Sequence, residues 1–193
     1  MNRPATDLLS RIQRVEDRLD IEQLAVRYAL AVDDRDIEGW VGLFVPDVRV
    51  GRHNRGRDAL REYITPQLRS FYRSIHQIAG HRVELITDDS AVGTVYCRAE
   101  HEVGEQWIVV AIRYDDTYRK IDGNWYFDKR IDRHWYEADV ATSPQSVGWH
   151  GWPSSATRPS VPRPVPAWAE FWAGVDTTTL TGSPIPEKER TAP

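Results

Sequence analysis

Cysteine is almost absent from this chain of 193 residues, which contains only Cys97. A single thiol cannot form a disulfide within the chain, and a lone cysteine among apolar neighbours is usually a packed residue. A nucleophilic cysteine would need a base beside it, and only His101 on the same segment could serve. We therefore expect Cys97 in the core or in the wall of a pocket.

Clustered charge and long apolar runs are also lacking. The 25 basic and 29 acidic residues give a net charge of −4, without a basic stripe that would suit nucleic acid. No apolar run approaches the ~20 residues of a membrane span, and residues 1–10 have no apolar signal core. These absences predict a cytoplasmic protein without nucleic-acid or membrane partners, and the length suits one domain plus an extension.

The first third of the chain has a helical pattern that ends near Asp33 and Asp34. Asp20 and Gln23 could form a capping box, so either one bent helix or two are expected here. A further helical face covers residues 37–44, a short strand is expected at 48–50, and Asp58 is the expected N-cap of a third helix. The apolar positions that repeat at three- and four-residue steps in the first helix are Leu8, Leu9, Ile12, Val15 and Leu19.

Residues 74–102 are predicted to form a β-hairpin with its turn at 87–90. Strand alternation places four residues of the second strand on one face: Val95, Cys97, Ala99 and His101. Because three of these side chains are small, they leave room beside His101, as a pocket wall would. His76 opens the first strand and can face His101 across a curved sheet. His81 would point to the opposite face of a regular strand, and we expect it at the surface.

The remaining strands complete an antiparallel pattern. Residues 106–119 have an apolar centre typical of a strand covered on both sides, and Asp122-Gly123 predicts a hairpin turn before a last strand at 125–135. Helices followed by hairpin-linked strands predict an α+β fold. Arg130 and His134 share one face of the last strand, where His134 could have a polar role in the pocket.

The composition changes at about residue 141, which suggests a domain at 1–140 and an extension at 141–193. The extension holds nine of the twelve prolines and a single possible short helix at 167–172. It also holds Trp149, Trp152, Trp168 and Trp172, whereas disordered tails are normally poor in aromatics. We expect an arm that packs its indoles on the domain or on a neighbouring subunit.

An ordered series of motifs resembles the SnoaL-like branch of the nuclear transport factor 2-like superfamily over residues 12–138. The motifs are Y-A-L-A-V-D-D-R-D at 28–36, L-F-V-P-D at 43–47, G-R-D-A-L-R-E-Y-I at 56–64, His76, D-D-S-A at 88–91 and D-G-N-W-Y-F-D-K-R at 122–130. The resemblance implies a cone of three helices on a strongly curved antiparallel sheet, a deep apolar pocket, and a homodimer or homotrimer.

The resemblance also implies site residues. Tyr28, Asp33 and His76 match the helix tyrosine, helix aspartate and strand histidine of the dehydratases of this branch, and His101 matches the second histidine of scytalone dehydratase. Arg130 lies near an arginine of the bile-acid dehydratase, although Lys129 and Arg133 compete for that role. We assign substrate contacts to six residues: Arg130, His134, Cys97, Trp40, Phe44 and Tyr72.

These residues suit a cofactor-independent lyase acting on a hydrophobic aromatic or polycyclic molecule by dehydration or retro-aldol cleavage. His76 with Asp33 would be the base, Tyr28 a polarising donor and His101 the second acid or base. Two alternatives stay open: an isomerase or cyclase using the same base, and a non-catalytic binding protein resembling a dioxygenase β subunit. The six histidines form no H-x-x-x-H pair or Cys-His cluster, so no metal is expected.

Overall fold

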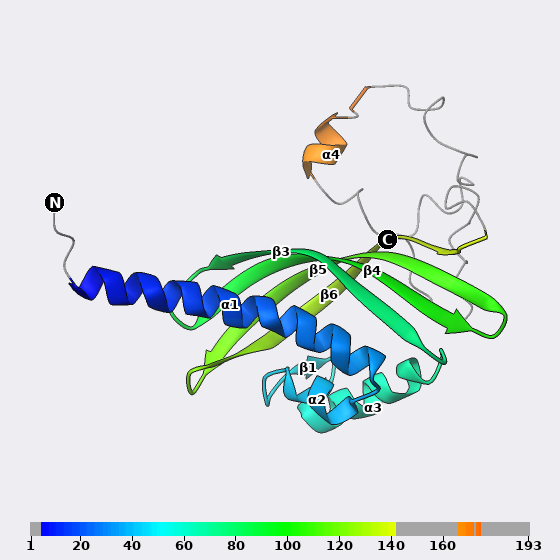
Figure 1. The fold of residues 1–193 in the computed structure, drawn as a ribbon, viewed down its shortest axis with the longest axis horizontal. Helices are drawn as coiled ribbons and strands as arrows, with labels where there is room; N and C mark the ends of the chain where they lie inside the picture. Colours follow the sequence, from blue (N-terminus) through cyan, green and yellow to red (C-terminus); the bar gives the residue numbers. More distant parts are fainter. Residues whose placement is uncertain (1–4, 142–165, 172, 175–193) are drawn as a thin grey trace.

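The computed structural model describes residues 5–141, 166–171 and 173–174. Helices come first, and four long strands follow (Figure 1). The elements are α1 (Ala5–Asp33), α2 (Ile37–Gly42), β1 (Arg49–Val50), β2 (Asn54–Arg55), α3 (Arg57–Leu68), β3 (Ser74–Leu85), β4 (Ser90–Val103), β5 (Gln106–Ile121), β6 (Asn124–Asp139) and α4 (Pro166–Phe171). This order confirms the α+β fold.

The four long strands form one antiparallel sheet in the order β3-β4-β5-β6, and each strand pairs with the next along the chain. Helix α1 packs along the sheet, mainly on β3, while α2, α3 and the small β1–β2 sheet gather at its C-terminal end (Figure 1). The apolar core lies between the helices and the sheet, with Ile21, Leu24 and Phe127 almost completely buried. This layering places the C-terminal end of α1, together with α3, beside the inner face of the sheet.

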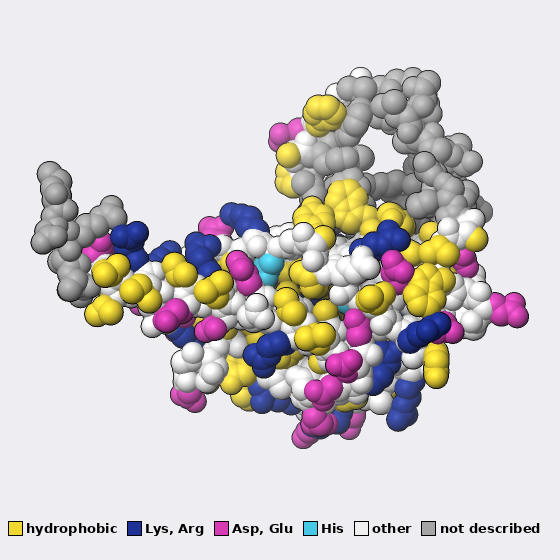
Figure 2. Space-filling view, in the orientation of Figure 1, with side chains coloured by type: hydrophobic (Ala, Val, Ile, Leu, Met, Phe, Trp, Pro, Cys, Tyr) yellow, Lys and Arg dark blue, Asp and Glu magenta, His cyan; other side chains and the backbone are white. Residues whose placement is uncertain are grey.

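Helix α1 is a single helix of 29 residues, so Asp20 and Gln23 cap nothing. The apolar face at the start of α1 is exposed: Leu8, Ile12 and Val15 are 45–57% accessible. The reason is that the first turns of α1 extend past the sheet, and hydrophobic side chains gather along this overhang (Figure 2). Asp17 fixes the helix where the overhang begins, because it accepts hydrogen bonds from Lys120 Nζ at 2.6 Å and Trp125 Nε1 at 3.0 Å.

The central hairpin is confirmed, and so is the small-residue face of β4. Its members Val95, Cys97, Ala99 and His101 are all buried. A register shift between Ile78 and Gly80 inserts one extra residue into β3. Side chains after the bulge therefore change faces, and His76 and His81 point to the same side of the strand instead of to opposite sides.

Of three further local features, the turn before β6 is as expected, whereas the register of β6 and the start of α3 are not. Asp122 and Gly123 form the expected turn, with positive φ angles of 49° and 80°. Strand β6 carries register shifts opposite β5, so Phe127 and Arg130 face the same side although they are three residues apart. Gly56, not Asp58, is the N-cap residue of α3, and Asp58 instead pairs with Arg61 in the first turn.

The extension is described only at α4 and at residues 173–174, where the expected short helix is confirmed at Pro166–Phe171. Trp149 and Trp152 lie outside the described residues, so the packing of the arm stays a prediction. None of the described helices is long and apolar enough to cross a membrane.

Candidate active site

A chamber of about 790 Å³ opens between the helices and the inner face of the sheet. Volumes of this size suit a small organic molecule of one to several rings. Its apolar walls include Trp40, Phe44, Leu60, Ile64, Val110 and Ile112. Into the same chamber face Tyr28, His76 and His101, which the sequence predicted as catalytic residues.

Asp33 and His76 form a hydrogen-bonded pair on the chamber wall. Asp33 is the last residue of α1 and His76 the third of β3, and their Oδ1 and Nδ1 atoms are 2.7 Å apart. Asp33 also accepts the His76 backbone N–H and the Ser74 hydroxyl, each at 2.8 Å. Burial raises the pKa of Asp33, but these hydrogen bonds outweigh it and hold the pKa below its ordinary value. The carboxylate therefore fixes the imidazole with Nε2 directed away from it.

His101 stands beside this pair, with its ring centre 5.3 Å from that of His76 and 4.4 Å from that of Phe71. Its side chain is enclosed, and burial together with repulsion by His76 lowers its pKa to about 3. A neutral imidazole can donate one hydrogen bond to a substrate and accept another, but it is a poor proton donor. This property restricts the second acid or base role that the sequence suggested for His101.

Tyr28 lies at the centre of an aromatic group. Its ring centre is 5.6 Å from Trp40, 5.9 Å from Tyr114 and 5.9 Å from Phe127. Burial raises the pKa of Tyr28 to about 12, so the phenol keeps its proton and can donate a hydrogen bond. Tyr114 from β5 also lines the chamber, and the sequence reading missed it because its strand reads as generally apolar.

Arg130 reaches the chamber, but its guanidinium is enclosed. The side chain is 5% exposed, and its Cζ lies 4.3 Å from the Tyr28 ring centre and 4.1 Å from that of Tyr114. Its Nε and Nη2 donate to Asp116 at 2.9 and 2.7 Å. Cations are attracted to the faces of aromatic rings, so the Arg130 guanidinium stabilises the positions of the Tyr28 and Tyr114 rings.

From the Arg130–Asp116 pair, hydrogen bonds extend across the inner face of the sheet from β5 to β3. Tyr118 donates its hydroxyl to Asp116 at 2.8 Å, and His81 Nε2 lies 2.9 Å from the same hydroxyl. His81 is therefore a partly buried member of this network, and the expectation of a surface histidine was wrong. The bulge in β3 explains the error, because it turns His81 inward.

Gly93 leaves the space that this network needs. A methyl group at Gly93 would lie 2.9 Å from Tyr118 and 3.1 Å from His81 Nε2, whereas Gly80 has nothing within 4 Å. Gly93→Ala is therefore expected to destabilise the protein by about 1–3 kcal/mol, the usual cost of overpacking. Gly80→Ala is the matched control and should unfold close to the wild-type denaturant midpoint. Equal midpoints for the two variants would contradict close packing around Gly93.

A second carboxylate–histidine pair lines the chamber on β6. His134 Nδ1 is hydrogen-bonded to Glu137 Oε1, and His134 Nε2 lies 3.1 Å from Asp132 Oδ2. Burial alone would lower the pKa of His134, but the two carboxylates outweigh it and raise the pKa to about 9. His134 is thus an imidazolium at neutral pH, in contrast to His101.

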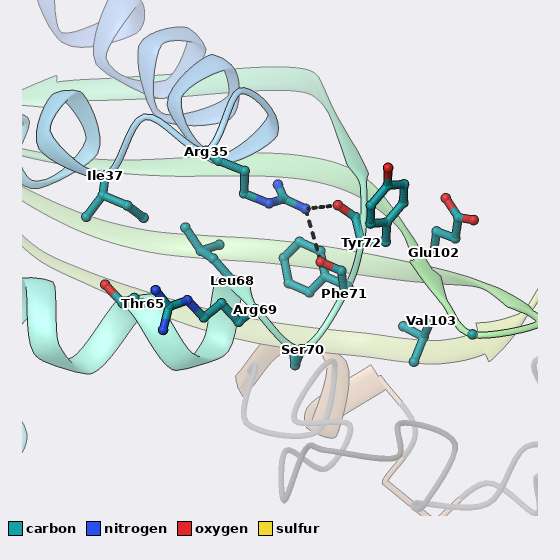
Figure 3. Close-up of a pocket in the computed structure, with 11 residues that line it drawn as sticks. Arg35, Ile37, Thr65, Leu68, Arg69, Ser70, Phe71, Tyr72, Glu102 and Val103 are labelled. Carbon is teal, nitrogen blue, oxygen red and sulfur yellow. Dashed lines mark hydrogen bonds between the residues drawn. The ribbon is translucent and has the colours of Figure 1, made fainter.

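The predicted substrate-contact residues separate into two groups. Trp40, Phe44, Arg130 and His134 line the chamber. Cys97 is packed in an apolar cluster on the sheet and does not line the chamber. Burial raises the pKa of its thiol to about 12. Tyr72 is 83% exposed and lies at a separate pocket of about 530 Å³ (Figure 3). Among the described residues, no three histidine, cysteine or acidic side chains are grouped to hold a metal ion.

The antiparallel sheet is covered by helices and borders a chamber that has a carboxylate–histidine pair on its wall. These features define a cone-shaped class of small α+β proteins. Residues 13–131 match the SnoaL-like domain family, and the chain belongs to this family of the nuclear transport factor 2-like superfamily. An uncharacterized protein of Mycobacterium tuberculosis strain H37Rv is 24% identical over 129 residues, which are 63% of this chain and 87% of that protein.

Solved structures share the fold. A scytalone-dehydratase-like protein of Novosphingobium aromaticivorans is 21% identical with a TM-score of 0.60, over 69% of this chain and 94% of that chain. A hexachlorocyclohexane dehydrochlorinase of Novosphingobium barchaimii is 23% identical with a TM-score of 0.61, over 69% of this chain and 96% of that chain. These neighbours show that the chain shares the cone-shaped architecture.

Proposed function

We propose that this protein is a cofactor-independent lyase acting on a hydrophobic aromatic or polycyclic molecule, by dehydration or by retro-aldol cleavage. The observation that carries the proposal is the 2.7 Å contact between Asp33 and His76 on the wall of a chamber that is lined by both apolar and polar side chains. A histidine fixed by a carboxylate is a general base suited to neutral pH. The neighbours described as a dehydratase and a dehydrochlorinase support an elimination.

The reaction would use the chamber residues as follows. His76 Nε2 takes a proton from a carbon next to a carbonyl, or from a hydroxyl in the retro-aldol case. Tyr28, with its proton retained, donates a hydrogen bond to the oxygen on which negative charge develops. His101, 5.3 Å from His76, orients the substrate as a neutral donor or acceptor.

The two alternatives use the same chamber differently. An isomerase or cyclase would return the proton to another carbon without releasing a leaving group. A binding protein would need no catalytic base, yet Tyr28, His76 and His101 converge on one chamber together with the Asp33 that orients His76. This convergence favours an enzyme over a binding protein.

A single bicyclic probe separates the three classes. β-Hydroxytetralone loses water to give a fluorescent naphthol, and its α-protons exchange in D₂O when a base and an oxyanion donor act on it. The lyase is expected to form naphthol at a rate that a metal chelator does not change. An isomerase would exchange α-protons without forming naphthol, and a binding protein would do neither. His53→Gln, at an exposed turn residue, is the control for a change of histidine content.

A further inference from the structure

The chamber contains two carboxylate–imidazole pairs of similar construction. In each pair one carboxylate holds Nδ1: Asp33 holds His76, and Glu137 holds His134. The His134 and Glu137 side chains are 10% and 7% exposed. Asp132, the second neighbour of His134, is 59% exposed and lies 3.1 Å from Nε2. Nδ1 is therefore fixed by a buried partner, while Nε2 faces a carboxylate that is more than half exposed to solvent.

Sheet register places the two pairs on opposite sides of the chamber floor. His76 on β3 pairs with Ala99 on β4, Ala99 with Val110 on β5, and Val110 with Glu137 on β6. The two residues between them are therefore small or β-branched and apolar. Of these two residues Val110 lines the chamber, so a substrate that rests on Val110 would have one histidine pair on each side.

The charged and titratable groups around His134 come from several elements. Those that share its chamber are Tyr28 (α1), Arg49 (β1), Tyr63 (α3), His76 (β3), His101 (β4), Tyr114 (β5), and Lys129, Arg130, Asp132 and Glu137 (β6). The two carboxylates in direct contact dominate, and they keep the His134 ring protonated at neutral pH. His134 thus has the protonated ring that a general acid requires.

We propose that His134 is the general acid of the reaction, which protonates a leaving hydroxyl group through Nε2. The role rests on the proposed lyase function and selects dehydration of an alcohol. His76 takes a proton from carbon, the C–H electrons form a C=C bond, the C–O bond breaks, and the oxygen takes a proton from His134 and leaves as water. The protons then equilibrate with solvent. A halide leaves without protonation, so an acid at this position distinguishes alcohols from halogenated substrates.

Two probes with different leaving groups test the role. β-Hydroxytetralone needs protonation of its hydroxide, whereas β-acetoxytetralone releases acetate, a far weaker base. His134→Gln should slow naphthol formation from the hydroxyl probe by about a hundredfold and leave the acetoxy probe within a few fold. His76→Gln should slow both probes, and His53→Gln neither. Equal slowing of both probes by His134→Gln, or no slowing of either, would overturn the role of His134.

A readout independent of turnover accompanies these rates. The imidazole of His134, followed by NMR, should titrate near pH 9, and Glu137→Gln should move this titration to lower pH. The rate with the hydroxyl probe should fall above the same pH and shift with it in Glu137→Gln. A rate with the hydroxyl probe that does not follow the titration of His134 would overturn the proposal. If the wild type eliminates neither probe, the lyase function itself fails, and the acid role of His134 fails with it.

Discussion

Replacing His76 by glutamine is expected to lower turnover by at least about a hundredfold while the protein stays folded. General bases contribute roughly 10²–10⁴-fold, and glutamine keeps a side chain of similar reach that can still hydrogen-bond Asp33 but cannot accept a proton. Naphthol formation from β-hydroxytetralone measures the rate, and circular dichroism checks the fold.

Asp33→Asn tests the other half of the pair. Asparagine can still accept from the His76 and Ser74 groups, but it no longer favours the protonated imidazole that forms during proton transfer. Ser74→Ala is the matched control, because it removes the 2.8 Å hydrogen bond to Asp33 and leaves the charge in place. Turnover of Asp33→Asn close to that of Ser74→Ala would contradict a catalytic carboxylate.

The largest loss of stability is expected from Asp116→Ala. Asp116 is buried with no exposed side-chain surface, and it neutralises an Arg130 side chain that is 5% exposed. Removing one partner of a buried ion pair leaves an uncompensated charge, which typically costs about 3–5 kcal/mol. Tyr118 would lose its hydrogen-bond acceptor in the same variant. Chemical denaturation at constant pH measures the free energy of unfolding.

The double variant Asp116→Ala, Arg130→Met supplies the control. Methionine fills part of the arginine volume without a charge, so the double variant should recover much of the stability that the single variant loses. A single variant within about 1 kcal/mol of the wild type would show that the pair is not buried as described.

The strand faces could be predicted from the sequence because alternation is local. The buried row of Val95, Cys97, Ala99 and His101 needed only the two-residue period of a regular strand. The position of Asp33 beside His76 could not be derived in this way, because the two residues are 43 positions apart. That part of the site came from the resemblance, and the distance in the structure agrees with it.

The misplacements have a common physical cause in irregular backbone. The bulge in β3 reversed the expected face of His81, and the shifts in β6 brought Phe127 beside Arg130. Asp116 was not predicted because a buried carboxylate depends on a partner from another strand, and no local pattern in β5 marks it. The overhang of α1 likewise depends on the extent of the sheet, so the exposed Leu8 could not be distinguished from a core leucine.

Asp33 is the last residue of α1, and its three hydrogen bonds all go to the first residues of β3. The proposed general base is thus assembled from two segments, and the pair exists only while the end of the helix is docked on the strand. Any local opening that frees the last turn of α1 separates the carboxylate from the imidazole, even if the sheet stays intact. The fraction of molecules in which the carboxylate and the imidazole are paired is therefore set by the docking equilibrium of one helix end.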